Sequence, residues 1–346
     1  MSTLKWGLID SIGHFNLGKS GAKPKFFCGR EALYFEELHT SPVLLSDDIN
    51  MDSYRLEAEV AFPESTGFAG LVFGARDSKN FELVYITPES DTTMGEIQYD
   101  PIMKGSSTWQ IYHGSSYQAA AFVPVGKWVK LSLEVQSNSA SVYVGDSTSP
   151  QLIIRKLQLG NSAGKIGIWG NLPCYISCFS VKEINPTKSI NAPLQSDLQK
   201  LAYDTYITEW MISKPYLYQN PPHIHKDWIK ATVEENGILN LNRLYTLTEK
   251  GTAVQLQCIF SLSENVDTNL LLGYSDKIRL WINNVEVHQG ECLWNPPVSD
   301  GRIRSDHVTI PVRWRKGVNT IHAEIINYEC MFGWGLSIKT GIYKLW

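Results

Sequence analysis

Three polar side chains alternate along one short run of the chain, where they could bind a ligand or act on it. Glu96, Gln98 and Asp100 stand two residues apart, with Ile97 and Tyr99 between them. Successive side chains of a β-strand point to opposite faces, so the three polar groups are expected on one face of a sheet. Amide and carboxylate groups in a row suit the hydroxyl groups of a sugar. The run therefore predicts a carbohydrate-facing row.

Aromatic and basic residues lie close to this row in the sequence. The candidates are Trp109, Tyr112, His113 and Tyr117, in a stretch rich in Gly and Ser, and Arg76, which precedes the row. Aromatic rings can stack on the C–H faces of a sugar, whereas imidazole and guanidinium groups can bind its hydroxyls. Most Trp and Tyr side chains of a β-sandwich belong to its core, so at most half of these rings are expected to be exposed.

The elements that must position these residues are predicted as β-strands. Runs at 69–75, 81–87 and 95–102 are rich in Val, Ile, Phe and Tyr and are separated by turn-forming residues. The earlier run at 54–60 alternates apolar and charged residues, as a half-buried strand does. Further apolar runs follow about every dozen residues, with no helical pattern between them. This spacing predicts an antiparallel β-sandwich over residues 1–185.

A change in composition marks the end of this sandwich. Residues 186–202 contain prolines, and Leu194, Leu198 and Leu201 form the stripe of a short amphipathic helix, so this segment is predicted as a linker. A second all-β pattern fills residues 203–346. In it, Ile278, Leu280 and Ile282 are expected on one strand face, and Asn283-Asn284 is expected to turn the chain into a hairpin.

The second pattern also contains polar and aromatic residues that could bind a sugar. They are Arg279, Trp281, Trp294 and Asp300. A second glycan site and an interface between domains are both compatible with such residues.

Composition excludes several classes of function. The length of 346 residues predicts two domains. Residues 1–185 carry 15 Lys and Arg against 19 Asp and Glu, and the remainder carries 16 against 16, so neither half has the basic excess that nucleic-acid binding needs. The segment at 13–20 matches the phosphate-binding pattern GxxxxGK[ST], but the sequence after it cannot readily form the required helix. Nucleotide binding is therefore not expected.

No insertion into a membrane is expected, because no apolar run approaches the roughly 20 residues that span a bilayer. The first residues show no secretory signal, so the chain as given is expected in the cytoplasm, or outside the cell if a signal has been removed. The sequence does not specify an oligomeric state.

Cysteine and histidine spacing gives little support to a metal or redox site. Cys174 and Cys178 are four residues apart, about 13 Å along a strand, which is too far for a disulfide. The six cysteines are expected to be free and mostly buried, and no CxxC motif occurs. His223 and His225 would share a strand face, but no third ligand stands nearby. No metal and no cofactor is therefore expected from spacing.

The strand order and a few turn signatures resemble known families. The runs GLVFGARD, NFELVYI, EIQYDPIMKGSSTWQIYHG, GKWVKLSLEV and GKIGIWG resemble the concanavalin A-like lectin/glucanase superfamily, closest to its laminin G-like and keto-disaccharide-hydrolase-like branches. The later runs VTIPVRWRKGVNTIHAEI and GWGLSIK resemble the galactose-binding-like jelly roll. The resemblance implies two antiparallel jelly-roll sandwiches joined by a short helical linker, with a glycan site on the concave sheet of the first. Galactose-binding-like domains often carry a structural calcium, but no dense Asp/Asn loop marks one in this sequence.

Three functions remain open for the acidic row. The leading interpretation is non-catalytic recognition of an oligo- or polysaccharide by the first domain. The alternative is a glycoside hydrolase: retaining enzymes of the superfamily carry an E-x-D-x-E signature, to which Glu96, Gln98 and Asp100 are similar, with Glu96 and Asp100 as the carboxylate pair. The third is a structural or interaction protein on the same fold, because fold alone does not fix function.

Overall fold

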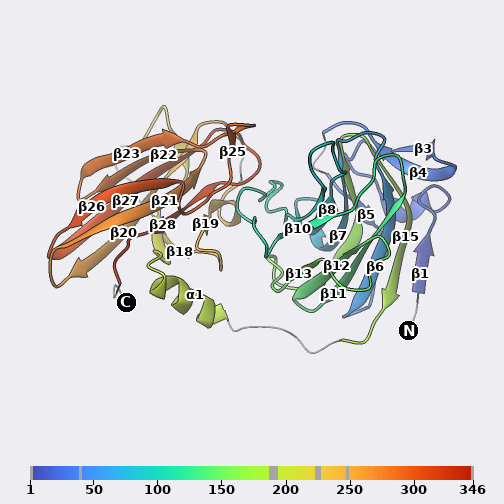
Figure 1. Cartoon of the computed structure of the whole chain (residues 1–346), viewed down its shortest axis with the longest axis horizontal. Coiled ribbons are helices and arrows are strands. Elements are labelled where there is room, and N and C mark those ends of the chain that lie inside the picture. The colour runs from blue at the N-terminus through green and yellow to red at the C-terminus, as the bar shows by residue number, and fades with distance from the viewer. Residues whose placement is uncertain (1–2, 39–40, 187–193, 223–226, 247–248, 344–346) are drawn as a thin grey trace. The chain divides into compact units, whose positions relative to one another are not determined.

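The computed structural model of the protein describes residues 3–38, 41–186, 194–222, 227–246 and 249–343 (Figure 1). Their regular structure is almost entirely antiparallel β-sheet, which confirms the predicted all-β class. Two compact units are present: one contains Met1–Gly105 and Tyr112–Asn191, and the other contains Ser106–Ile111 and Ala192–Trp346. The short segment Ser106–Ile111 was not anticipated, because the sequence pattern suggested two uninterrupted domains.

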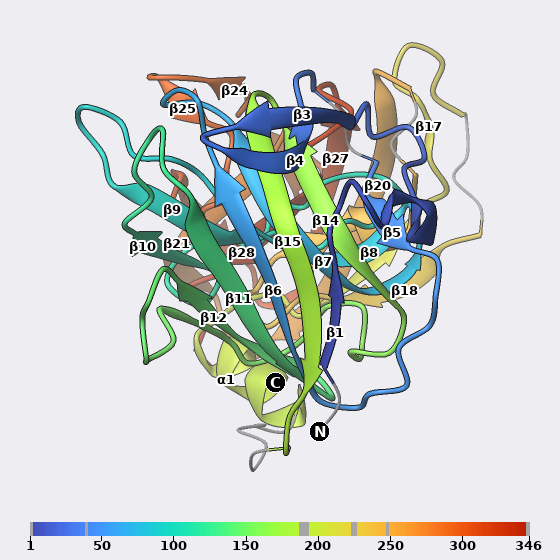
Figure 2. The ribbon, with the colours of Figure 1, turned by 90° about the vertical axis from the view of Figure 1, so that its right-hand side faces the viewer.

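The first unit is built from two antiparallel sheets in its described part. The sheet called here the β6 sheet has the order β13-β12-β11-β6-β15-β4-β3, with β1 also paired to β15. Figure 2 shows its long strands side by side. Its members are β1 (Thr3–Trp6), β3 (Lys23–Phe27), β4 (Arg30–Phe35), β6 (Tyr54–Ala61), β11 (Val129–Gln136), β12 (Ser139–Val144), β13 (Leu152–Ile154) and β15 (Cys174–Glu183).

The facing sheet, called the β8 sheet, has the order β10-β9-β8-β7-β14-β5-β2. Its members are β2 (Phe15–Asn16), β5 (Val43–Leu45), β7 (Phe68–Asp77), β8 (Asn80–Ile86), β9 (Gly95–Tyr99), β10 (Gln118–Ala121) and β14 (Lys165–Asn171), and the 3-10 helix η1 (Ile12–His14) precedes β2. The strands expected at 69–75 and 81–87 are therefore present, whereas the strand expected at 95–102 ends at Tyr99, so Asp100 lies beyond it. The three strands are adjacent in this sheet.

The core of the first unit lies between the two sheets. In β6, Tyr54, Leu56 and Val60 are buried while the charged residues between them are partly exposed, as the alternation predicts. In contrast, β7, β8 and β9 are buried on both faces. Residues that line the second face of the β8 sheet, among them Leu83, Tyr85 and Trp169, form an apolar cluster of their own. This sheet therefore has little polar surface to offer.

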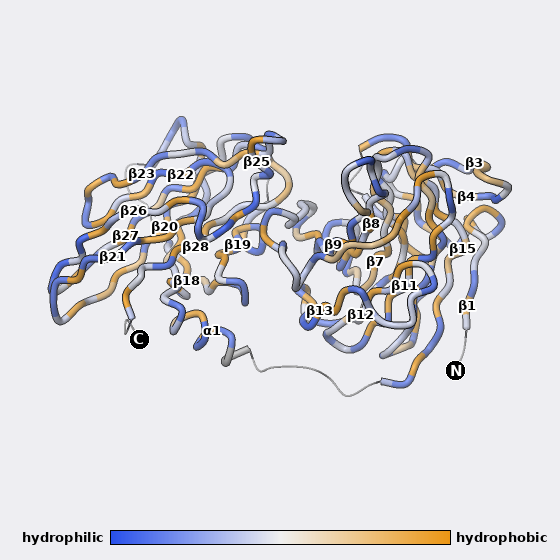
Figure 3. The backbone as a smooth tube through the Cα atoms, viewed as in Figure 1, coloured by the Kyte–Doolittle hydropathy of each residue, from blue (hydrophilic) through white to orange (hydrophobic). Residues whose placement is uncertain are grey.

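The second unit is also a sandwich, whose larger sheet is called the β20 sheet. It has the order β18-β16-β20-β27-β22-β23, with β17 also paired to β20. Its members are β16 (Glu209–Ile212), β17 (Tyr216–Leu217), β18 (Ile229–Thr232), β20 (Thr252–Leu262), β22 (Lys277–Ile282), β23 (Val285–Glu291) and β27 (Gly317–Asn327). Figure 3 shows hydrophilic and hydrophobic residues alternating along these strands.

The smaller elements complete this unit. The facing sheet has the order β19-β28-β21-β26, and a separate hairpin pairs β24 with β25. These strands are β19 (Leu239–Asn240), β21 (Val266–Ser275), β24 (Trp294–Asn295), β25 (Ser299–Asp300), β26 (Val308–Trp314) and β28 (Gly335–Lys339); the helices are α1 (Leu194–Tyr203) and the 3-10 helix η2 (Leu241–Arg243). Trp210, Trp314 and Trp334 lie in the core, and Leu201 of α1 packs there too.

Local predictions hold in both units. Ile278, Leu280 and Ile282 are buried together on β22. Asn283 and Asn284 have φ angles of 50° and 67°, the left-handed backbone that a tight hairpin turn requires. The chain after the GxxxxGK[ST] match continues into β3 instead of a helix, as expected.

The cysteines are only partly as expected. All six are free. Cys28 and Cys178 are exposed, which corrects the expectation of burial. The reason for Cys178 is a register shift in the pairing of β15 with β6 between Ser177 and Ser180, which breaks the regular alternation of the strand.

A buried carboxylate ties the β8 sheet to the connection between the two sheets. The side chain of Glu82 is fully buried and accepts hydrogen bonds from the Tyr99 hydroxyl (2.5 Å) and from the backbone N–H of Leu159 (2.7 Å). The Tyr99 oxygen in turn accepts from the backbone N–H of Gln158 (2.9 Å). Burial, and then the Glu82 carboxylate, raise the pKa of Tyr99. Residues 158 and 159 lie between β13 and β14, so these bonds hold the crossing from one sheet to the other.

Removing this carboxylate should destabilise the first unit. Glu82→Ala leaves the buried Tyr99 hydroxyl and Leu159 N–H without the carboxylate that now accepts from them, and we expect the free energy of unfolding to fall by about 2–4 kcal/mol. Urea denaturation measures this quantity. Glu31→Ala, at an exposed position of β4, is the matched control and should change the stability by less than about 0.5 kcal/mol. Equal effects of the two substitutions would contradict the role of Glu82.

Candidate functional site

The predicted polar row of the first unit is not an open surface. Gln98 is fully buried and Asp100 is 4% exposed, whereas Glu96 is half-buried. The Gln98 amide donates to the backbone carbonyls of Tyr99 (2.6 Å) and Tyr112 (2.8 Å). The prediction of a carbohydrate-facing row is therefore wrong for Gln98 and Asp100.

The reason is the path of the chain after β9. The backbone N–H of Tyr99 donates to the carbonyl of Tyr117 (2.9 Å), and the carbonyl of Tyr112 accepts from Gln98. Residues 112–117, which were expected to present aromatic rings to a ligand, thus run back along β9 and contact its polar side chains. Buried amide groups are almost always satisfied by such internal partners.

The remaining predicted residues do not form one exposed site, although the rings of Tyr112 and Tyr117 pack together with their centres 5.3 Å apart. Tyr112 is fully buried and Tyr117 is 5% exposed. Trp109 belongs to the second unit, where its ring lies 5.8 Å from that of Phe332. His113 is half-buried, and the exposed Arg76 donates to the carbonyl of Leu159. Of the proposed ligand contacts, Glu96, His113 and Arg76 stay predictions for the first unit.

The outer face of the β20 sheet is where polar and aromatic side chains gather within reach of solvent. Strand pairing aligns Gln255, Glu324 and Arg279 in one row across β20, β27 and β22. The next row on the same face contains Gln257, His322 and Trp281. The alternation of β22 indicates this orientation, since Arg279 and Trp281 lie opposite its buried residues.

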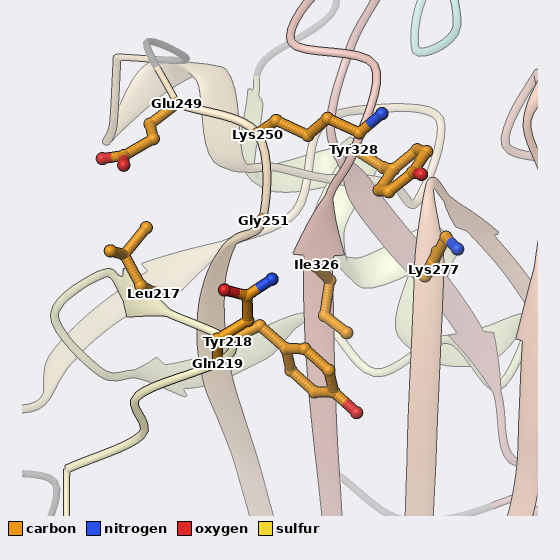
Figure 4. A pocket seen from close by; sticks show the side chains of 9 residues that line it. All are labelled: Leu217, Tyr218, Gln219, Glu249, Lys250, Gly251, Lys277, Ile326 and Tyr328. Carbon is orange, nitrogen blue, oxygen red and sulfur yellow. The ribbon is translucent and has the colours of Figure 1, made fainter.

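A pocket of about 450 Å³ lies at the end of this face. Its volume is within the range of small-molecule sites. Figure 4 shows the side chains that line it, which come from segments far apart in the sequence. They are Leu217, Tyr218, Gln219, Glu249, Lys250, Gly251, Lys277, Ile326 and Tyr328. Ile326 and Lys277 form the row that follows Glu324 and Arg279, so the pocket is continuous with the polar face.

Hydrogen bonds fix the polar groups beside the pocket. Glu324 is 6% exposed and accepts from the Tyr216 hydroxyl and from the Gln255 amide (3.0 Å). Burial, and then the bond to Glu324, raise the pKa of Tyr216 well above its usual value. Burial lowers the pKa of His322, so its imidazole is neutral at pH 7 and can both donate and accept. These groups can therefore serve as ordered partners for hydroxyls.

Cations and aromatic rings are paired around the same face. Arg279 lies 4.8 Å from the Trp281 ring and forms an ion pair with Glu286 (2.8 Å). The ammonium groups of Lys250 and Lys277 lie 3.6 Å and 4.2 Å from the centre of the Tyr328 ring. Lys250 chiefly, and then Lys277, lower the pKa of Tyr328. These contacts restrict the rings to defined positions before any ligand binds.

The buried carboxylate of Asp276 fixes the backbone at Tyr328, which forms part of the pocket wall. Asp276 is fully buried and accepts from the backbone N–H groups of Tyr328 (2.5 Å) and Glu329 (2.7 Å) and from the Ser275 hydroxyl (2.8 Å). Burial raises the pKa of Asp276 to about 6, although these hydrogen bonds oppose the shift. The position of Tyr328 in the pocket thus depends on a group that does not touch the pocket itself.

The other residues proposed for a second glycan site lie elsewhere. Trp294 and Asp300 face each other in the β24–β25 hairpin, which is not part of the β20 sheet. Asp300 is bound by Arg304, which lowers the pKa of this carboxyl to about 2. Sequence patterns indicated Arg279 and Trp281, but they missed Tyr218, Lys250 and Tyr328, which lie in connections with no periodicity.

No metal-ligand set accompanies this site. Within the described residues, no group of three or more His, Cys, Asp or Glu side chains could hold a metal ion. A structural calcium therefore finds no such ligand set there. His223 and His225 lie outside the described residues. In the part of the chain that the structure describes, no helix is long and apolar enough to cross a bilayer.

Comparisons with known proteins identify similar structures but no matching family. No family model matches the sequence, and no curated protein matches it. Among solved structures, a carbohydrate-binding module from Bacillus subtilis is similar with a TM-score of 0.35 and 12% identity, covering 48% of this chain and 91% of that chain. A galectin from Caenorhabditis elegans has a TM-score of 0.31 and 12% identity, covering 43% of this chain and 96% of that one.

A third similar structure is a xylan beta-1,4-xylosidase from Bacillus halodurans, with a TM-score of 0.32 and 16% identity. The match covers 44% of this chain and 33% of the xylosidase chain. The neighbours thus include both binding proteins and hydrolases. At these scores they do not decide between binding and catalysis, and the contacts of the site must do so.

The buried Asp276 should make the stability of the second unit depend on pH. Its pKa of about 6 in the folded protein lies above the ordinary value of 3.8, so the folded state binds the proton more tightly than the unfolded chain does. The stability that this proton binding contributes is fully present below about pH 4 and is lost as the pH rises through 6. We expect Asp276→Asn to remove this dependence, because an amide can accept from both N–H groups and donate to Ser275. The difference in unfolding free energy between the two proteins should change by about 2–3 kcal/mol from pH 4 to pH 6.5.

Urea denaturation at several pH values measures this difference. Asp267→Asn, at a position whose side chain is 78% exposed on β21, is the control and should leave the pH profile unchanged. Parallel profiles for wild type and Asp276→Asn would show that Asp276 does not titrate in this range.

Proposed function

We propose that the protein binds carbohydrate without cleaving it, and that the outer face of the β20 sheet with its adjoining pocket is the binding surface. The observation that carries the proposal is the mixture of side chains there. Aromatic rings from Tyr218, Trp281 and Tyr328 lie beside hydrogen-bonding groups of fixed orientation. A sugar presents apolar C–H faces and a rim of hydroxyls, and this surface offers a partner to each.

The extent of the surface favours an oligosaccharide over a single sugar. A second pocket, of about 220 Å³, lies on the same sheet and is lined by Glu209, Met211, Lys230, Gln257 and Ile259, together with Trp210 and Cys258. Along β20, Gln257 is four residues from Ala253, the neighbour of Ile326 in the first pocket. Four residues of a strand span about 13 Å, which exceeds the width of one sugar ring. The two pockets can therefore bind different units of one chain.

Catalysis is not part of this proposal. Most glycoside hydrolases use two carboxyl groups that flank the bond to be cleaved. Among the described residues that line the first pocket, Glu249 is the one carboxylate, and the nearby Glu324 is engaged by Tyr216 and Gln255. In the first unit, the burial of Asp100 keeps it from a substrate, so the proposed pair with Glu96 has no open site.

Loss of one ring should weaken binding. Tyr218 is 39% exposed and its ring points along the pocket in Figure 4, so we expect Tyr218→Ala to reduce affinity for a bound oligosaccharide about tenfold, the effect of one lost stacking contact. Titration calorimetry with the strongest ligand from a glycan array gives the affinity. Tyr203→Ala removes a tyrosine that is 80% exposed on α1 and is the matched control.

An assay for released reducing ends accompanies the titration. We expect binding with no release of product by the wild-type protein. Absence of binding to every glycan on the array would refute the proposed function. Product release that is lost in Glu96→Gln would replace it with the hydrolase alternative.

A further inference from the structure

The pocket places two positive charges against one aromatic ring. Lys250 precedes β20, Lys277 begins β22 and Tyr328 follows β27, so three separate segments bring them together. Both ammonium groups lie within 4.2 Å of the centre of the Tyr328 ring. In Figure 4, the two lysine side chains approach the ring from different sides at one end of the pocket.

The acidic groups nearby do not cancel these charges. Glu249 lines the pocket, but in Figure 4 its carboxylate points away from Tyr328, on the side of Leu217. Glu291 forms an ion pair with Lys277 (3.1 Å), yet its side chain is 60% exposed, where such a pair contributes little. Glu324 and Asp276 are both buried, and donors of the protein itself engage their carboxylates. The end of the pocket at Tyr328 is therefore positive.

We infer that this end of the pocket binds an anionic substituent of the ligand, a carboxylate or a sulfate, through Lys250 and Lys277. The inference rests on the proposed function and assigns acidic oligosaccharides as the ligand class. An ammonium group has three donors, and its contact with the face of Tyr328 leaves donors directed to the side. The ring also orders both lysines, so less conformational entropy is lost when an anion binds.

The test compares acidic and neutral oligosaccharides of equal length. Titration calorimetry would use tetragalacturonate for the carboxylate, a sulfated galactan tetrasaccharide for the sulfate ester, and xylotetraose and cellotetraose as neutral ligands, at low and at high salt. We expect at least one acidic ligand to bind more tightly than both neutral ones, with an advantage that shrinks as salt screens the charges. The acidic ligand that binds more tightly identifies the substituent.

Substitutions of the two lysines test whether these side chains bind the anionic substituent. We expect Lys250→Gln and Lys277→Gln each to weaken acidic-ligand binding about tenfold, the loss of one charge-assisted hydrogen bond, and to weaken any neutral-ligand binding by a clearly smaller factor, because both side chains line the pocket. Lys316→Gln removes an exposed lysine from the turn at the opposite end of β27 and is the control for net charge. Thermal unfolding of each variant checks that it folds.

The outcomes separate this inference from the function on which it rests. Neutral ligands that bind as tightly as acidic ones, with no effect of either lysine substitution, overturn the inference and leave carbohydrate binding in place. No binding to any oligosaccharide refutes both. Inorganic sulfate that competes for Lys250 and Lys277 while no oligosaccharide binds also refutes both, because the site would then be one for a free anion.

Discussion

A carboxylate that has no access to water must accept hydrogen bonds from donors of the protein itself. In both units this requirement fixes the conformation of a connection between strands. In the first unit, Glu82 binds the Tyr99 hydroxyl and the Leu159 N–H. In the second, Asp276 binds the N–H groups of Tyr328 and Glu329. Each group is fully buried, so the loss of its partners would be costly. Sheet pairing builds the sandwiches, whereas these carboxylates fix connections that pairing does not reach.

The same requirement explains why the two units differ as binding surfaces. In the first unit, polar side chains such as Gln98 are used to satisfy backbone carbonyls inside the fold. In the second, Gln257, Arg279 and His322 remain partly accessible on the outer face of the β20 sheet. The polar row of β9 and the polar rows of β20, β22 and β27 are alike in sequence. They differ in whether another part of the chain covers them.

Periodicity could predict much of the fold because it depends only on neighbouring residues. The alternation of 54–60, the shared face of Ile278, Leu280 and Ile282, and the turn at Asn283-Asn284 are all local properties, and all are present. Local pattern also indicates that Glu96, Gln98 and Asp100 alternate. It contains no information on whether the chain returns over them, as residues 112–117 do.

The candidate site was less predictable for the same reason. Arg279 and Trp281 could be identified from strand alternation, but Tyr328 and Lys250 are adjacent only because β20 and β27 pair along their whole length. Such long-range pairing has no signature in the residues themselves. The membership of Ser106–Ile111 in the second unit is another result of this kind, since nothing in its composition separates it from the residues before and after it.

The discontinuity of the second unit bears on how this region could be inherited or exchanged between genes. Gln110 donates to Glu329, its carbonyl accepts from Ile303, and its side-chain oxygen accepts from Ser275. A coding fragment that begins at Ala192 lacks all of these bonds. Recombination that transfers only the coding sequence of the second sandwich would therefore produce an incomplete domain. The two sandwiches are expected to be inherited together.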